Sequence, residues 1–226
     1  MIYYTPVHPS EHSKLLGENF AENLAQEMER YYYPFSKKGR PIQLAKETWE
    51  YAVADALPDG EWIGAGKNIV DVKTDDITID VKGLSCNSVT GMTTEASILQ
   101  NNKLENDNFA SLFESADYSG LMDMFVKPLG NKVLAADNLY IMATIRDKKT
   151  GDVYYSLLRV EEHENENFVD EMYMDAKRSV SVPMIDPQFG KTYLYIPKRR
   201  LEIRLKLSGM KDYLVWSHKL NQELLV

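Results

Sequence analysis

The sequence predicts an α/β fold in which helices flank a mixed β-sheet, and three observations lead to this class. Two amphipathic helical patterns lie within residues 10–57. Segments with the alternation typical of strands begin at residue 68. The 226 residues, of which 44% are hydrophobic and 27% charged, are enough for one sizeable core, and we find no repeat or low-complexity linker. We therefore expect a single domain over residues 1–226.

Apolar residues at helical spacing predict the first two helices. Ser10 is expected to cap the first helix and Pro34 to end it. Its apolar positions are Leu16, Phe20, Leu24, Met28 and Tyr31. Pro41 suits the first turn of the second helix, and Pro58-Asp59-Gly60 should end it. The apolar positions of that helix are Ala45, Trp49, Ala52, Val53, Ala56 and Leu57.

The rest of the chain alternates between strand and helix patterns. A hairpin is predicted for Asn68–Lys73 and Ile77–Gly83, and a helical region with interruptions for Thr94–Phe125. Further strands are expected at Leu139–Arg146, Val153–Val160, Thr192–Ile196 and Leu201–Leu207, and a last helix at Tyr213–Leu225.

The hairpin carries the residues that suggest chemistry. Side chains alternate between the two faces of a strand, so Asp80 and Lys82 should share a face opposite to the apolar Ile79 and Val81. A turn centred on residues 75–76 would pair 74 with 77, 73 with 78, 72 with 79 and 71 with 80. Asp71 would then lie across from Asp80. Two facing carboxylates repel each other unless a cation lies between them, so the pair indicates a site for a hard divalent ion.

A third carboxylate is expected from the second helix. Glu50 precedes Val53 and Leu57 by three and seven residues, so it lies at the edge of the buried face. A solvent-facing carboxylate is the alternative interpretation of Glu50, and Glu47, one turn earlier, is the rival candidate.

In this order, Glu50, Asp71 and then Asp80-Val81-Lys82 resemble the motif of the PD-(D/E)XK nuclease superfamily, with Val70 in place of the proline. The resemblance covers about residues 40–86. It implies a restriction-endonuclease-like fold, a Mg²⁺ cofactor held by Glu50, Asp71 and Asp80, and DNA as the substrate. Lys82 would orient a water molecule and stabilise charge on the phosphate.

A free-standing chain of this size resembles most a Type II restriction endonuclease, a class that commonly cleaves double-stranded DNA as a homodimer. Mn²⁺ should substitute for Mg²⁺. Two alternatives stay open: a structure-specific or repair nuclease, such as a junction resolvase or nicking enzyme, and a non-catalytic α/β binding module. Divalent-dependent cleavage separates the nucleases from the module.

Charge placement adds the DNA-binding candidates. Residues 191–211 hold seven basic residues and one acidic residue, so they carry +6 in a chain of net charge −8, which leaves −14 for the remainder. Phosphate contacts are expected from this segment and from the loop before the second helix. The candidates are Lys37, Lys38, Arg40, Lys198, Arg199, Arg200, Arg204 and Lys206. The alternative for the alternating stretch 198–207 is an edge strand protected by its charges.

The remaining features indicate a cytoplasmic protein. The N-terminus lacks a signal-peptide pattern, and no apolar run has membrane-spanning length. Cys86 is the single cysteine, which excludes an internal disulfide and fits a reducing compartment. The histidines His8, His12, His163 and His218 show no spacing of metal ligands or of a base and nucleophile, so we assign them no function.

Overall fold

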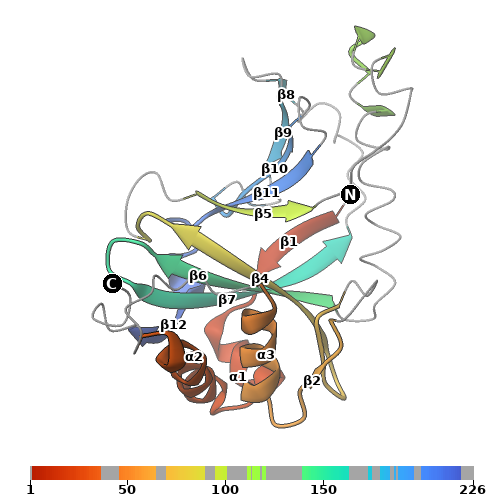
Figure 1. Ribbon diagram of the computed structural model, residues 1–226. Coiled ribbons are helices and arrows are strands. Elements are labelled where there is room, and N and C mark those ends of the chain that lie inside the picture. The colour runs from red at the N-terminus through yellow and green to blue at the C-terminus, as the bar shows by residue number, and fades with distance from the viewer. Residues whose placement is uncertain are drawn as a thin grey trace.

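The computed structural model contains three α-helices and two β-sheets in its described part (Figure 1). The described residues are 2–36, 46–64, 70–89, 95–100, 111–112, 114–117, 119–120, 139–162, 173–174, 179–183, 186, 188–195 and 200–219. The combination of helices with a mixed sheet confirms the predicted α/β class.

The predicted first helix is in fact two helices, α1 (Pro9–Leu16) and α2 (Phe20–Ser36). They are separated at Gly17, whose φ of 90° lies in a region that glycine adopts at little cost. The expected cap at Ser10 is wrong, because His8 is the N-cap residue and its ring nitrogen accepts a hydrogen bond from the Ser10 N–H. The expected stop at Pro34 is also wrong: α2 continues to Ser36, with the proline in its last turn.

The second predicted helix is confirmed as α3 (Lys46–Ala56), and it ends before Pro58 as expected. The position proposed for Pro41 lies outside the described residues. Within the described part of the chain, no helix is long and apolar enough to span a membrane.

The larger sheet has seven strands, of which six follow the order β1-β7-β6-β4-β3-β2, while β12 pairs with β7. Their bounds are β1 Ile2–Pro6, β2 Glu61–Trp62, β3 Val72–Lys73, β4 Thr78–Cys86, β6 Leu139–Asp147, β7 Asp152–Glu162 and β12 Val215–Lys219. Strands β4 and β6 are parallel, and the other pairs are antiparallel, so the sheet is mixed.

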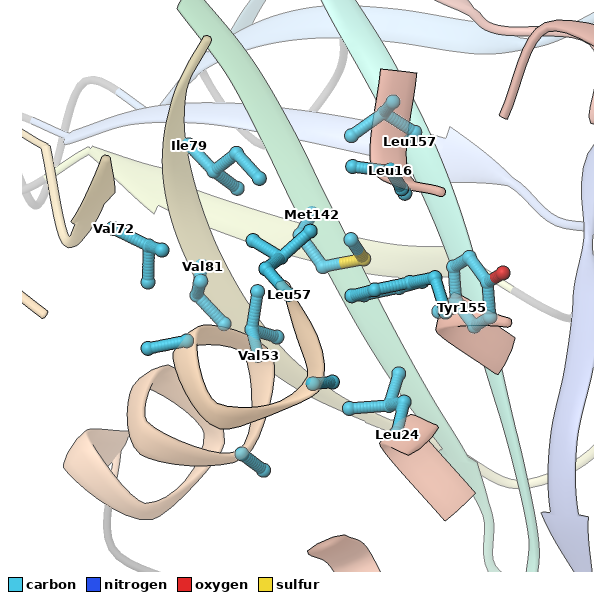
Figure 2. Close-up of a cluster of buried hydrophobic side chains, with 14 of the residues drawn as sticks. Leu16, Leu24, Val53, Leu57, Val72, Ile79, Val81, Met142, Tyr155 and Leu157 are labelled. Atoms are coloured by element: carbon cyan, nitrogen blue, oxygen red, sulfur yellow. The ribbon is translucent and has the colours of Figure 1, made fainter. Parts of the chain in front are cut away.

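The three helices cover one face of this sheet (Figure 1). Alternate residues of the central strands, such as Ile79 and Val81 of β4 and Met142 of β6, are fully buried there. Figure 2 shows Val53 of α3, and Leu57 just after the end of this helix, directed at these strand residues. Burial of each such side chain stabilises the fold by roughly 1.5–3 kcal/mol, so this contact fixes α3 relative to β4.

The smaller sheet lies over the opposite face and has the order β5-β11-β10-β9-β8. Its strands are β5 Glu95–Gln100, β8 Tyr173–Met174, β9 Ser179–Pro183, β10 Gly190–Tyr195 and β11 Arg200–Lys206. A second apolar cluster joins the two sheets, and it contains Leu205 and Leu207 as well as Ile141 and Ile145 of β6. Two apolar layers, one on each face, therefore enclose the larger sheet.

Most predicted strands are confirmed, since β4, β6, β7, β10 and β11 lie within a few residues of their expected bounds. Two predicted helical regions are wrong over part of their length. Residues 95–100 form β5, which pairs with β11, and residues 215–219 form β12, which follows the short 3₁₀ turn Lys211–Tyr213 and pairs with β7. In both places pairing with a neighbouring strand overrides the local pattern. Within the predicted helical region 94–125, five described residues are helical: 111, 112, 114, 119 and 120. Apart from these residues and β5, most of the region lies outside the described part of the chain.

Candidate active site

The predicted hairpin register is confirmed at its centre. Val72 pairs with Ile79 and Lys73 with Thr78, and the Thr74 N–H donates to the Ile77 carbonyl over 2.8 Å. The Thr74 hydroxyl also accepts the N–H groups of Asp76 and Ile77, so a compact turn fixes the register. A shift by one residue would move Asp80 to the helix-covered face, and the buried Ile79 prevents it.

Asp71 lies just before β3, at a bend where the regular pairing stops. Its N–H donates to the Ile79 carbonyl (3.1 Å), and its Oδ2 accepts the Val81 N–H (2.9 Å). Of the predicted strand Asn68–Lys73, the described residues 70–73 contribute only Val72 and Lys73 to β3, and the pair 71–80 is not part of the regular ladder. The two side chains nevertheless lie close to each other, since the carboxyl group of Asp80 contributes to the raised pKa of Asp71.

Asp80 and Lys82 project from the same face of β4, as the alternation predicts. The Lys82 Nζ forms an ion pair with Asp80 Oδ1. The side chain of Asp80 is 6% exposed and that of Lys82 18%, so the pair is shielded from bulk water and screened less than a surface pair. Lys82 therefore places a positive charge directly beside the two aspartates.

Glu50 of α3 faces inward, and the solvent-facing interpretation is wrong. Its residue exposure is 1%, and its Oε2 accepts a hydrogen bond from Trp62 Nε1 of β2 over 3.0 Å. The rival Glu47 is exposed. The carboxylates of Glu50 and Asp71 both approach Gly64: a Cβ added there would lie 2.7 Å from Glu50 Oε2 and 3.4 Å from Asp71 Oδ1. Glu50 thus lies beside Asp71, and Glu50, Asp71 and Asp80 are called the carboxylate cluster below.

Close packing of α3 on β4 sets the distance between the helix and the hairpin. At Gly83 an added Cβ would lie 2.7 Å from Cδ1 and Nε1 of Trp49, the residue before Glu50. The indole therefore rests directly on the glycine backbone, and a larger residue would push the helix away.

The carboxylate cluster is buried, and burial disfavours the ionised form of its acids. Burial, above all, then the hydrogen bond and the negative charge of Asp80, raise the pKa of Asp71 from its ordinary value near 3.8 to about 6, while the Val81 N–H and Lys82 act in the opposite direction. Three carboxylic acids, Glu50, Asp71 and Asp80, are each at most 4% exposed. Such an environment favours the protonated form of Asp71 unless a cation approaches.

The oxygen donors fit a hard divalent ion by their chemistry. Among the residues that the structure describes, however, no three His, Cys, Asp or Glu side chains are arranged to hold a metal ion as they lie. Protein groups engage them instead: Trp62 contacts Glu50, the Val81 N–H contacts Asp71, and Lys82 contacts Asp80. An ion would therefore need a rotation of at least one carboxylate.

The basic candidates lie elsewhere. In β11, Lys206 is exposed and Arg204 is half-buried, and both alternate with Leu205, which is buried between the sheets. They are thus on the face of the smaller sheet that is turned away from the larger one. Pairing on both sides, with β5 and β10, shows that the edge-strand interpretation of this segment is wrong. Arg200 begins the same strand, while Lys37, Lys38, Arg40, Lys198 and Arg199 lie outside the described residues.

Two residues of the cluster, Trp62 and Gly64, were not expected from the sequence. Neither belongs to the Glu50, Asp71, Asp80-Val81-Lys82 pattern, and residues 61–64 lack the length of a recognisable strand. The pairing of β2 with β3 was the missing signal, since it brings this segment beside Asp71.

Comparison of the chain with protein-family models, with curated proteins and with solved structures finds no match.

Proposed function

We propose that the protein is a Mg²⁺-dependent endonuclease that hydrolyses phosphodiester bonds of double-stranded DNA. One observation carries the proposal: the buried carboxyl groups of Asp71 and Asp80 interact, Lys82 contacts Asp80, and the buried carboxylate of Glu50 borders Gly64 together with that of Asp71. Burying several like charges destabilises a fold, so an arrangement of this kind indicates chemistry more than structure.

In this proposal Glu50, Asp71 and Asp80 hold the ion. Mg²⁺ would supply a Lewis acid that polarises the phosphoryl oxygen and acidifies a water molecule. Below about pH 6 the ion would have to displace a proton from Asp71, because the pKa of this carboxyl group is raised to about 6. Lys82 would place its ammonium group where charge develops on the phosphate and would orient the attacking water.

The finer assignment follows from the sequence resemblance. We propose a Type II restriction endonuclease with the restriction-endonuclease-like fold, acting as a homodimer in the cytoplasm, with Mn²⁺ able to replace Mg²⁺. Arg200, Arg204 and Lys206 of β11 are the described candidates for contacts to DNA phosphates, alongside Lys37, Lys38, Arg40, Lys198 and Arg199.

The test is incubation of the purified protein with plasmid and phage DNA, with Mg²⁺ and with excess chelator. Discrete fragments that form only with the divalent ion would support a sequence-specific endonuclease. Cleavage confined to branched or nicked DNA would instead favour a structure-specific nuclease. Intact DNA under every condition would contradict the proposal and leave the non-catalytic binding module.

A further inference from the structure

The geometry around Glu50 depends on Trp62. The indole Nε1–H donates to Glu50 Oε2 over 3.0 Å. The indole also packs against Tyr51, the residue after Glu50, with ring centroids 4.6 Å apart and an interplanar angle of 53°. A rigid ring, held by a contact with the same helix, therefore fixes the direction of this carboxylate.

Gly64 lies two residues further along and borders the same carboxylate. The Ile63 N–H donates to the Asp71 carbonyl over 2.9 Å, which keeps this segment beside the bend. A Cβ on residue 64 would lie 2.7 Å from Glu50 Oε2, 2.8 Å from Trp62 Nε1 and 3.4 Å from Asp71 Oδ1. The space that a methyl group would fill is therefore bordered by both carboxylates and by the indole donor.

Space, and not backbone conformation, explains the glycine at this position. The described glycines with a positive φ are Gly17, Gly151 and Gly190, and Gly64 is not one of them. An alanine at 64 would meet the end of the Glu50 side chain, which can rotate, and the fixed indole of Trp62, and the three nearest atoms are all side-chain atoms. Gly64→Ala should accordingly displace the Glu50 carboxylate and leave the fold intact.

We propose that Trp62 and Gly64 are positioning residues of the cation site. Trp62 orients the Glu50 carboxylate, and Gly64 keeps open the space between Glu50 and Asp71 through which an ion is coordinated. This inference rests on the proposed metal-dependent function, and it assigns a role to two residues outside the sequence motif. Groups that orient a metal ligand typically contribute roughly 10–100-fold to metal affinity.

A merely structural hydrogen bond makes a different prediction. If Trp62 only satisfies a buried glutamate, its loss lowers the thermal stability of the ion-free protein and leaves the ion affinity of the folded protein unchanged. The inference is therefore tested by ion affinity, measured without DNA and without turnover.

The experiment is a calorimetric titration of the full chain with Mn²⁺ alone, at a pH above the Asp71 pKa of about 6. Trp62→Phe removes the N–H donor and keeps an aromatic ring against Tyr51. Trp216→Phe is the matched control, since Trp216 is 53% exposed on β12. We expect Trp62→Phe and Gly64→Ala to weaken Mn²⁺ binding by roughly 10–100-fold, and Trp216→Phe to leave it unchanged.

The two possible failures are distinguishable. If the wild-type protein binds Mn²⁺ and both variants bind it equally well, the positioning role is overturned, and the proposed nuclease function stands. If the wild-type protein binds no Mn²⁺, the ion site and the positioning role fall together. Should Trp62→Phe fail to fold, Gly64→Ala decides the matter.

Discussion

The acidic hairpin of the larger sheet and the basic strand of the smaller sheet are organised in opposite ways. At the hairpin, Glu50, Asp71 and Asp80 are each at most 4% exposed, and named hydrogen bonds or an ion pair hold each of them. On β11, Lys206 is exposed and Arg204 half-buried, on a face turned away from the larger sheet.

This difference separates two kinds of contribution. Buried and fixed groups provide the geometry that a reaction needs, and each removal should cause a large loss. Long cations at a solvent-facing surface adjust to a partner, and each should change affinity modestly and in a salt-dependent way. The two regions should therefore differ by orders of magnitude in their mutational effects.

The largest effect is expected at the ion pair. Lys82→Ala should reduce the single-turnover cleavage rate by roughly 10²–10³-fold, and Asp80→Asn by at least as much, because both remove charges next to the reacting phosphate. Asp76→Asn, in the exposed turn of the same hairpin, is the matched control and should cleave normally. Normal cleavage by either site variant would place the active site elsewhere.

The pH dependence comes next and reports on Asp71. Because burial and Asp80 raise its pKa to about 6, ion binding must displace a proton at lower pH. Mg²⁺ affinity should therefore fall by roughly tenfold per pH unit below about 6 and level off above it. Titration of the protein with Mg²⁺ at a series of pH values measures this fall in affinity. An affinity that does not change with pH would exclude Asp71 as a ligand.

The same shift makes a prediction of opposite sign for the ion-free protein. A carboxyl group with a raised pKa in the folded state stabilises the fold while it is protonated, and this contribution is lost as the pH rises from about 4 through about 6. In the presence of chelator, the free energy of unfolding should therefore decrease as the pH is raised from about 4 through about 6. Asp71→Asn should remove that part of the pH dependence.

A smaller effect is expected where α3 packs on β4. Gly83→Ala would push a methyl group into the Trp49 ring and should lower the free energy of unfolding by about 1–3 kcal/mol. Denaturant titration measures the loss. An unchanged midpoint would show that the helix can move relative to the hairpin, and that Glu50 is held less rigidly than we infer.

The smallest effect is expected on β11. Lys206→Gln should weaken DNA binding on all sequences and reduce the slope of log affinity against log salt by about one unit. Lys14→Gln, at an exposed lysine of α1 outside the basic segment, is the control. Identical slopes for Lys206→Gln and the wild type would show that this face does not contact phosphate.

The acidic hairpin could be predicted from the sequence because its information is local. The alternation of side chains along the strand predicted that Asp80 and Lys82 share one face and that Val81 points to the other face. The short turn predicted the pairing of Val72 with Ile79. The bend at Asp71 and the contact of Trp62 with Glu50 could not be predicted, because they depend on the pairing of β2 with β3.

The basic strand β11 shows more clearly what the sequence alone cannot predict. Its alternation predicted a strand correctly, but the same pattern suits an edge strand and an inner strand. Only its two neighbours, β5 and β10, decide between them, and β5 lies about a hundred residues earlier in a segment whose local pattern predicts a helix. Non-local pairing of this kind is not encoded in the segment itself.

The central claim, that the buried carboxylate cluster cleaves DNA, is tested most directly by comparing two glutamates of one helix. Glu50 is 1% exposed and faces the cluster, whereas Glu47, one turn earlier on α3, is exposed. The measurement is the Mg²⁺-dependent single-turnover cleavage of supercoiled plasmid by the wild type, Glu50→Gln and Glu47→Gln. The account predicts that the wild type and Glu47→Gln cleave at similar rates, while Glu50→Gln loses roughly 10²-fold or more. Equal rates for all three proteins, or no cleavage by the wild type, would contradict it.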